Sequence, residues 1–185
     1  MLVAYLRSMN KIYIPGVIVV EGKEDVSYLS SFVDSQFFTT NGYDISKAKL
    51  EFLKRVSEVN RIIVLTDNDE AGKKISEVIK KEICAVIDIK TDKITRKNYK
   101  KSGVAETPKE EVLGVLSPYS SNKEKHDKLV DYQLNKIISL SSDSEMIKSK
   151  IVNDYRLIDG NTKYLSQQLQ MLKIEPKEII EKYGN

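Results

Sequence analysis

Two short apolar runs, each followed directly by an acidic residue, constrain the fold of this chain more than any other feature. Residues 17–20 (VIVV) run into Glu21, and residues 62–66 (IIVLT) run into Asp67. Short runs rich in β-branched residues and followed by a helical pattern are typical of buried parallel strands. The carboxyl ends of parallel strands meet at one edge of the sheet, where open α/β sheets bind their ligands. We therefore expect these two acidic side chains to lie together.

The second run is followed by two aspartates, Asp67 and Asp69, on either side of one residue. Alternation along an extended chain places both carboxylates on the same side, at a spacing that suits a shared divalent ion. Because Glu21 joins them and the three carboxylates repel one another, a cation has to compensate their charge. The pattern predicts a magnesium site and phosphate chemistry. In the alternative interpretation, Glu21 pairs with Lys23 and Asp69 only caps the following helix.

The first 118 residues alternate between strand and helix patterns. We expect strands over residues 17–20, 37–40, 61–66 and 85–89, and helices over residues 24–33, after Ser46 and from Glu70. Strands separated by helices favour parallel order with right-handed crossovers. The sequence therefore predicts a compact α/β domain, residues 1–118, with a four-stranded parallel sheet between helices.

The pattern changes after a serine-rich segment around Pro118, which we interpret as a linker. Beyond it, apolar residues recur at helical spacing, as in Leu165, Leu169 and Leu172. Pro176 is placed to open a last short helix. Residues 119–185 are therefore expected to form a small all-α domain.

Charge is informative only locally. The 185 residues carry 30 basic and 27 acidic side chains, a formal net charge of +3, which does not by itself indicate a nucleic-acid partner. Residues 90–102 differ, because they carry six basic side chains against one acid. A basic cluster beside an acidic metal site suits contact with nucleic-acid phosphates, whereas the alternative is a solvated loop. The residues expected to make such contacts are Arg96, Lys97, Lys100 and Lys101, with Lys23, Lys73 and Lys74 nearer the strand ends.

Composition excludes several classes of protein. The single cysteine, Cys84, excludes an internal disulfide and a cysteine-built zinc site, and its apolar neighbours predict a buried thiol. No apolar stretch approaches the roughly 20 residues that span a bilayer. The first residues also lack the apolar segment of a signal peptide. We therefore expect a cytoplasmic protein that makes no contact with a membrane.

Two segments, VVEGKED around Glu21 and LTDNDEAGKKI around Asp67, resemble the toprim domain of bacterial primases, topoisomerases, recombination nucleases and small RNA maturases. In this resemblance Glu21 corresponds to the family's glutamate, and Asp67 and Asp69 correspond to its Asp-x-Asp pair. Gly72 corresponds to the glycine of the following helix. The resemblance implies that the aspartates bind Mg²⁺ and that the glutamate is a general acid/base or a further ligand.

Within that superfamily the chain most resembles the ribonuclease M5 family. The likeness includes residues 40–42 (TNG), where the family has a threonine–arginine–glycine turn, and the C-terminal segment YRLIDGNTKYLSQQLQMLKIEPKEI. It also includes the lysine-rich segment that leads into residues 102–106. The chain departs from the family at Asn41, which replaces the arginine, and at Glu106, which is displaced by one position from the family's acid. Glu106 is therefore a further candidate for the active site.

This resemblance implies a magnesium-dependent endoribonuclease that matures precursor 5S ribosomal RNA by phosphodiester cleavage. Glu21, Asp67, Asp69 and Glu106 would be catalytic, the first three at the metal, and Asn41 would bind RNA together with the basic residues named above. The helical domain would recognise the shape of the RNA or the 5S-binding large-subunit ribosomal protein. Two alternatives stay open, namely another toprim nuclease that acts on DNA and an RNA-binding factor without catalysis.

Overall fold

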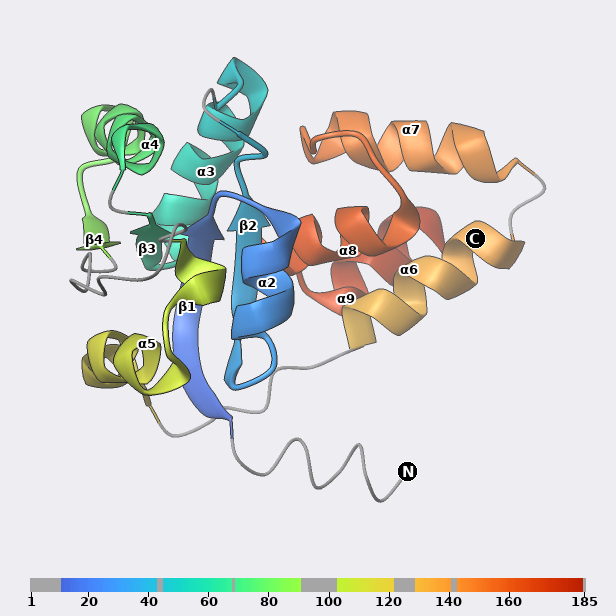
Figure 1. Cartoon of the computed structure of the whole chain (residues 1–185). Helices are drawn as coiled ribbons and strands as arrows, with labels where there is room; N and C mark the ends of the chain where they lie inside the picture. Colours follow the sequence, from blue (N-terminus) through green and yellow to red (C-terminus); the bar gives the residue numbers. More distant parts are fainter. Residues whose placement is uncertain are drawn as a thin grey trace.

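A sheet of four parallel strands lies at the centre of the molecule, as the sequence predicted (Figure 1). The computed structural model describes residues 11–42, 45–67, 69–90, 103–121, 129–140 and 143–184. The strands are β1 (Ile12–Val20), β2 (Val33–Thr39), β3 (Ile62–Thr66) and β4 (Val86–Lys90). Their order is β2-β1-β3-β4, so the chain places β2 on one side of β1 and β3 on the other. The topology therefore reverses between β1 and β3, the position at which open α/β sheets bind ligands.

Helices cover both faces of this sheet because side chains alternate along its strands. Val17 and Val19 of β1 pack with α3 and α4 on one face, while Ile18 and Val20 pack with α2 and α5 on the other. All four side chains are fully buried. Burial on both faces explains why the strands are continuous apolar runs in the sequence. The helices are α2 (Lys23–Leu29), α3 (Lys47–Val59), α4 (Glu70–Glu82) and α5 (Lys109–Leu116), with a short 3₁₀ turn, η1 (Val104–Glu106), before α5.

The ends of some elements differ from the sequence predictions. Ser46 caps α3 as expected, since its side chain accepts the Lys49 N–H at 3.3 Å. However, α2 ends at Leu29 instead of residue 33, because a turn follows it and Val33 already belongs to β2. The prediction of a buried Cys84 was wrong. This residue is exposed, because it lies in the bend before β4 begins.

The C-terminal part is helical, as predicted, and packs beside β2 and α3 (Figure 1). Leu165 and Leu169 share one hydrophobic cluster with Phe38 of β2 and Phe52 of α3. The domain boundary after residue 118 stays a prediction. No helix within the described ranges is long and apolar enough to cross a membrane. The short 3₁₀ turn η2 (Ser117–Tyr119) still packs against β1 and α5. The C-terminal part contains α6 (Leu129–Leu140), α7 (Ser144–Asp154), α8 (Thr162–Met171) and α9 (Pro176–Tyr183).

Gln168, a fully buried residue of α8, holds the chain that leads into this helix. Its Oε1 accepts the Ile158 N–H and its Nε2 donates to the Ile158 carbonyl, both at 2.7 Å. The amide side chain therefore pairs with the backbone as a neighbouring strand would, and it fixes the turn at residues 159–161.

We expect Gln168→Leu to lower the free energy of unfolding by about 1–3 kcal/mol, because it leaves both backbone groups of Ile158 unpaired. Urea unfolding followed by circular dichroism measures this loss. The exposed neighbour provides a control, and Gln167→Leu should change stability by less than about 0.5 kcal/mol. Equal losses in the two variants would contradict the structural role assigned to Gln168.

Candidate active site

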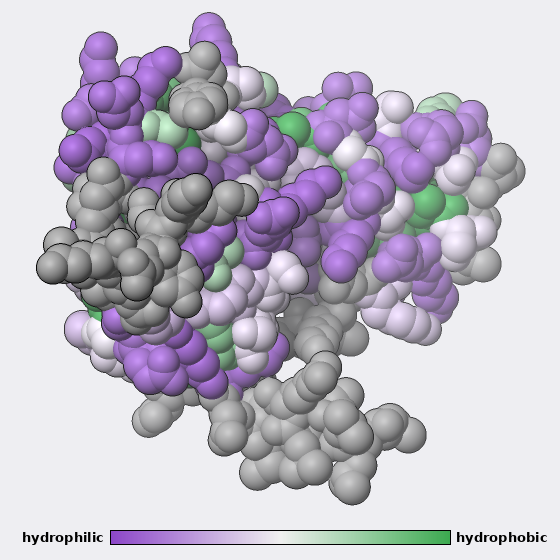
Figure 2. Space-filling view, in the orientation of Figure 1, coloured by the Kyte–Doolittle hydropathy of each residue, from purple (hydrophilic) through white to green (hydrophobic). Residues whose placement is uncertain are grey.

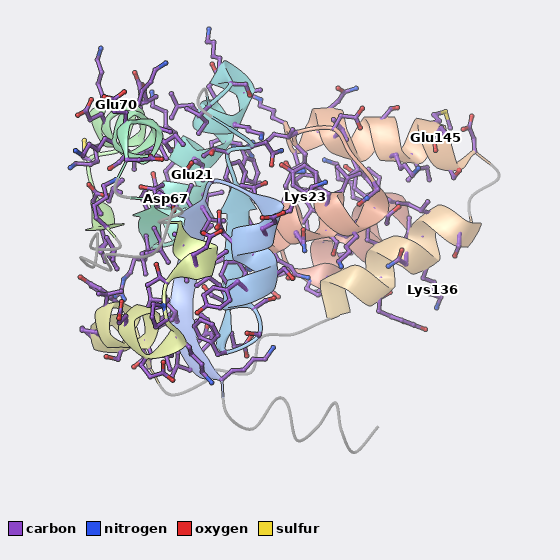
Figure 3. The ribbon with its side chains drawn as sticks, in the orientation of Figure 1. Glu21, Lys23, Asp67, Glu70, Lys136 and Glu145 are labelled. Carbon is purple, nitrogen blue, oxygen red and sulfur yellow. The ribbon has the colours of Figure 1, made fainter. Side chains whose placement is uncertain are left out.

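The ends of β1 and β3 bring two of the predicted acidic residues together (Figure 3). Glu21 follows β1 and Asp67 follows β3, and Glu21 Oε1 accepts the Asp67 N–H at 3.2 Å. On the other side of β1, the Asn41 N–H donates to the Glu21 carbonyl at 2.9 Å. The sequence prediction that these carboxylates meet at one edge of the sheet is therefore correct in geometry.

The segment before α5 adds a third carboxylate to this edge. Asp67 Oδ1 accepts the Val104 N–H at 2.6 Å, which ties η1 to the end of β3. A methyl group on Gly103 would clash with Glu106 Oε2 and lie 3.1 Å from Asp67 Oδ2. Oxygens of Glu106 and Asp67 thus approach the same point, and the structure places Glu106 beside Asp67 although its acid is displaced relative to the family.

Asp69 caps α4, as the alternative interpretation predicted, and its part in binding a metal ion stays a prediction. Its Oδ1 accepts the Gly72 N–H at 2.8 Å, so it caps α4. At the same time its charge acts on Glu21 and Asp67, both of which it repels. Helix capping uses one carboxylate oxygen, so the cap does not remove Asp69 from the site.

Asp25 is a residue of the site that the sequence analysis missed. It lies in the first turn of α2, where Oδ2 accepts the Gly22 N–H at 2.9 Å. Burial raises the pKa of Asp25, against the backbone amides of Gly22 and Ala105, and repulsion from Glu106 adds to the rise. Its spacing of three residues from Gly22 was the available signal, but the same spacing is typical of an ordinary helix cap. Glu21, Asp25, Asp67, Asp69 and Glu106 are called the acidic edge below.

Lys90 is a second missed residue, and it is a cation. The sequence analysis grouped it with the basic residues 90–102, whereas it is the last residue of β4. Its Nζ donates to Thr66 Oγ1 at 2.7 Å and to the Gly72 carbonyl at 3.1 Å, and it pairs with Asp88 Oδ1 at 3.3 Å. Lys90 therefore supports the end of β3 and the start of α4, and its charge favours the ionised form of Glu21.

Burial, and after it mutual repulsion, raises the pKa of carboxyl groups in the acidic edge. Burial raises the pKa of Asp67 to about 6, against the hydrogen bond from Val104, and Glu21, Asp25 and Asp69 raise it further by repulsion. Burial also raises the pKa of Glu21, with added repulsion from Asp69 and Asp25. The folded protein therefore holds electrostatic repulsion that a bound cation would relieve.

The described side chains of the acidic edge do not enclose a metal ion. Among the described residues, no three histidine, cysteine or acidic side chains are arranged to hold a metal ion together. Mg²⁺ usually keeps several waters and binds one or two carboxylates together with substrate phosphates. The oxygens of Asp67 and its acidic neighbours suit that mode.

The predicted RNA-binding residues surround the acidic edge where the structure describes them. Lys23 and Asn41 are exposed on either side of Glu21, at the start of α2 and after β2. Lys73 and Lys74 are exposed in the first turns of α4. The remaining candidates, Arg96, Lys97, Lys100 and Lys101, lie outside the described residues.

Comparison with known proteins identifies the family. The family described as the toprim domain matches residues 16–101. A ribonuclease M5 of Mesoplasma florum is 32% identical over 83% of this chain and 83% of its own length. A ribonuclease M5 of Staphylococcus aureus is 31% identical over 82% of this chain and 87% of its own length, and one of Mycoplasma genitalium is 28% identical over 91% and 94%. The chain belongs to the ribonuclease M5 family. The resemblance inferred from the sequence is thereby confirmed.

This ribonuclease M5 family member needs glycine at position 72. A methyl group there would clash with the carbonyl oxygen of Asp67 and lie 2.9 Å from Glu21 Oε1. We expect Gly72→Ala to lower the free energy of unfolding by about 1–3 kcal/mol, as overpacking does, and to separate the two carboxylates. Thermal unfolding measures the loss.

Gly114 provides the matched control, because nothing lies within 4 Å of a methyl group placed on it. Since Gly114 lies within α5, Gly114→Ala should stabilise the protein by up to about 1 kcal/mol. If the Gly72→Ala variant unfolds at the same temperature as the wild type, the close approach of Asp67 and Glu21 around Gly72 is not required.

Proposed function

We propose that this chain is a magnesium-dependent endoribonuclease that matures precursor 5S ribosomal RNA by phosphodiester cleavage. The observation that carries the proposal is the match of ribonuclease M5 proteins to more than four-fifths of both chains. The acidic edge at the reversal point of the sheet supports the same activity, because phosphoryl transfer needs positioned carboxylates and a divalent ion. A ribosomal RNA substrate would also account for a cytoplasmic location.

Asp67 and Asp69 are the residues that would hold the metal. Toprim domains are metal-dependent, and the repulsion within the acidic edge supports cation binding here. A bound Mg²⁺ would lower the pKa of a coordinated water and offset negative charge on the phosphate. Glu21, which already accepts the Asp67 N–H, would serve as a further ligand or transfer the proton of the attacking water. Glu106 lies beside Asp67 and would be a further catalytic carboxylate.

Basic and polar residues around the acidic edge would position the RNA backbone. Contacts of this kind supply affinity that depends on salt concentration and do not read sequence. The C-terminal helices would then recognise the shape of the RNA or a 5S-binding large-subunit ribosomal protein that presents it. The residues proposed to contact phosphates are Lys23, Asn41, Lys73, Lys74, Arg96, Lys97, Lys100 and Lys101.

The decisive experiment is cleavage of a 5S precursor transcript in Mg²⁺ by wild type and by Asp69→Asn, with and without the 5S-binding ribosomal protein. Asparagine caps a helix as well as aspartate does, so this variant removes the charge and keeps the cap of α4. We expect discrete cuts at the ends of the mature sequence, slowed by about a hundredfold or more in the variant. Sequencing gels of end-labelled RNA measure both.

A DNA duplex of the same sequence separates the rival activities. Cleavage of the DNA but not of the RNA would indicate another toprim nuclease. Binding of the transcript without cleavage under any condition would indicate a non-catalytic RNA-binding factor. Undiminished cleavage by Asp69→Asn would remove this residue from the active site.

Metal binding has a readout that is independent of cleavage. Because the ionised Asp67 is repelled by its neighbours, we expect Asp67→Asn to raise the unfolding temperature in EDTA, by the equivalent of about 0.5–2 kcal/mol. Mg²⁺ should reverse this order, since a ligand at 100 times its Kd stabilises by about 2.7 kcal/mol. Differential scanning fluorimetry with and without Mg²⁺ measures both effects. Equal responses of the two proteins to Mg²⁺ would place the ion elsewhere.

A further inference from the structure

A short segment, residues 103–107, connects the acidic edge with α5 and contains the 3₁₀ turn η1. Its two ends are joined to each other, because Thr107 Oγ1 donates to the Gly103 carbonyl at 2.9 Å. Within the turn, the Thr107 N–H donates to the Val104 carbonyl at 3.2 Å. The segment is therefore a closed unit whose position depends on what holds it from outside. We call it the η1 segment.

The first residues of the η1 segment are attached to the acidic edge. The Val104 N–H donates to Asp67 Oδ1 at 2.6 Å, and the Val104 side chain is fully buried in the hydrophobic cluster that contains Val20 and Leu65. The same segment carries Glu106 to its place beside Asp67. The position of the segment therefore decides how the Asp67 carboxylate is oriented and where Glu106 lies.

The last residue of the η1 segment is attached to α2. The hydroxyl of Tyr28 donates to the Thr107 carbonyl at 2.5 Å, across 79 positions of sequence. The hydrogen bonds of α5 begin one residue later, because the N–H groups of Glu111 and Val112 both donate to the Pro108 carbonyl. Tyr28 therefore supplies a donor to a carbonyl that lies just outside the helix.

The ring of Tyr28 fixes the direction of its hydroxyl. The ring packs edge to face against Phe32, with 5.1 Å between ring centres, and lies against the hydrophobic cluster that also contains Val104. Figure 2 shows pale and green residues over α2 among hydrophilic ones, as expected for a helix with one apolar side. Burial raises the pKa of Tyr28, and two glutamates of α5 raise it further, so the hydroxyl keeps its proton and donates.

Tyr28 differs from the other residue of α2 that holds this segment. Asp25 lies three positions earlier, on the same face of the helix, and accepts the backbone amide of Ala105. Asp25 is itself part of the acidic edge, whereas Tyr28 reaches that edge through the η1 segment. A substitution of Tyr28 therefore changes the support of the site and leaves the charge of the site as it is.

We propose that Tyr28 is a positioning residue for the cleavage reaction, whose hydroxyl holds the η1 segment where Val104 orients Asp67 and Glu106 lies beside it. This inference rests on the proposed ribonuclease function and adds a residue that acts without contacting the metal or the RNA. The alternative is that Tyr28 only packs α2 against the sheet, in which case its ring matters and its hydroxyl does not.

Tyr28→Phe tests the hydroxyl, because it keeps the ring. We expect the rate of 5S precursor cleavage at saturating RNA to fall by about tenfold, since a hydrogen bond that positions the reacting groups is lost. The KM should stay within about twofold of the wild-type value, because the groups proposed to contact RNA are unchanged. Gel assays of end-labelled transcript over a range of RNA concentrations measure both quantities.

A second readout does not need cleavage. A cation that binds the folded protein raises its unfolding temperature according to its affinity. For Tyr28→Phe we expect the Mg²⁺ concentration that gives half of this rise to increase by about threefold or more, because Asp67 is less well oriented. Differential scanning fluorimetry in EDTA and at increasing Mg²⁺ measures it. A role in packing alone would lower the unfolding temperature equally at every Mg²⁺ concentration and would overturn the proposal.

Tyr119→Phe is the matched control, because it removes the same hydroxyl from a ring that packs against the same hydrophobic cluster. Tyr119 belongs to η2, and the Ser121 N–H nearby donates to the Tyr13 carbonyl in the first residues of β1, whereas Glu21 follows the last. Tyr119 thus lies near the end of β1 that is remote from the acidic edge. Its substitution should leave the cleavage rate and the Mg²⁺ response within about twofold.

Thr107→Val provides a test within the η1 segment. It removes the hydroxyl that donates to the Gly103 carbonyl and keeps the shape of the side chain. If Tyr28 acts through this segment, the two substitutions disturb the same contact, and the double variant should cleave within about twofold of the slower single variant. Rate losses that multiply in the double variant would show that Tyr28 acts by another route and would overturn the proposal.

The outcomes separate this inference from the proposed function, once urea unfolding curves show that each variant is folded. Cleavage of the 5S precursor by wild type, with an unchanged rate and Mg²⁺ response in Tyr28→Phe, would overturn the positioning role alone. A weaker Mg²⁺ response in Tyr28→Phe, without cleavage of any RNA by wild type, would support the link to Asp67 and overturn the ribonuclease proposal. Equal losses in Tyr119→Phe would reduce the effect to packing of the cluster and overturn the positioning role.

Discussion

The hydrogen bond from the Asp67 N–H to Glu21 Oε1 is the interaction on which the rest of this structure depends. The two residues are 46 positions apart and meet only because β1 and β3 are parallel neighbours. The same contact limits position 72 to glycine, because a methyl group there would approach both Asp67 and Glu21. Asp69 then caps α4 through the Gly72 N–H, so these two hydrogen bonds tie two strand ends to the start of a helix.

Burying several carboxylates together at the acidic edge is unfavourable in free energy, and neighbouring groups reduce this penalty in two ways. Backbone amides donate to the carboxylates of Glu21, Asp25, Asp67 and Asp69, which partly replaces the water lost on burial. Lys90 adds a positive charge near the end of β3, where its hydrogen bonds to Thr66 and Gly72 hold it. The apolar core of β1 and β3 supplies the stability that allows the remaining repulsion to persist. Such a site is organised before any cation arrives.

The elements that the sequence revealed were those whose signal is local. Continuous apolar runs predict buried parallel strands, and acids that follow them must lie at one edge, so Glu21, Asp67 and Asp69 were accessible to reasoning from sequence alone. Asp25 and Lys90 were not, because an acid in a first helical turn and a lysine beside other lysines have ordinary explanations. Their proximity to the site follows from the strand order, which no local pattern contains.

Selectivity within the superfamily has to come from outside the acidic edge. In the proposed reaction, a metal ion and a proton acceptor at the ends of β1 and β3 would not by themselves distinguish one nucleic acid from another. The C-terminal helices share a hydrophobic cluster with α3, so they are held in a fixed position beside the sheet. In the proposed function, helices held at that position would restrict which RNA reaches Glu21. Function is set by the site and its surroundings and not by the fold alone, so a shared sheet edge does not by itself fix the substrate.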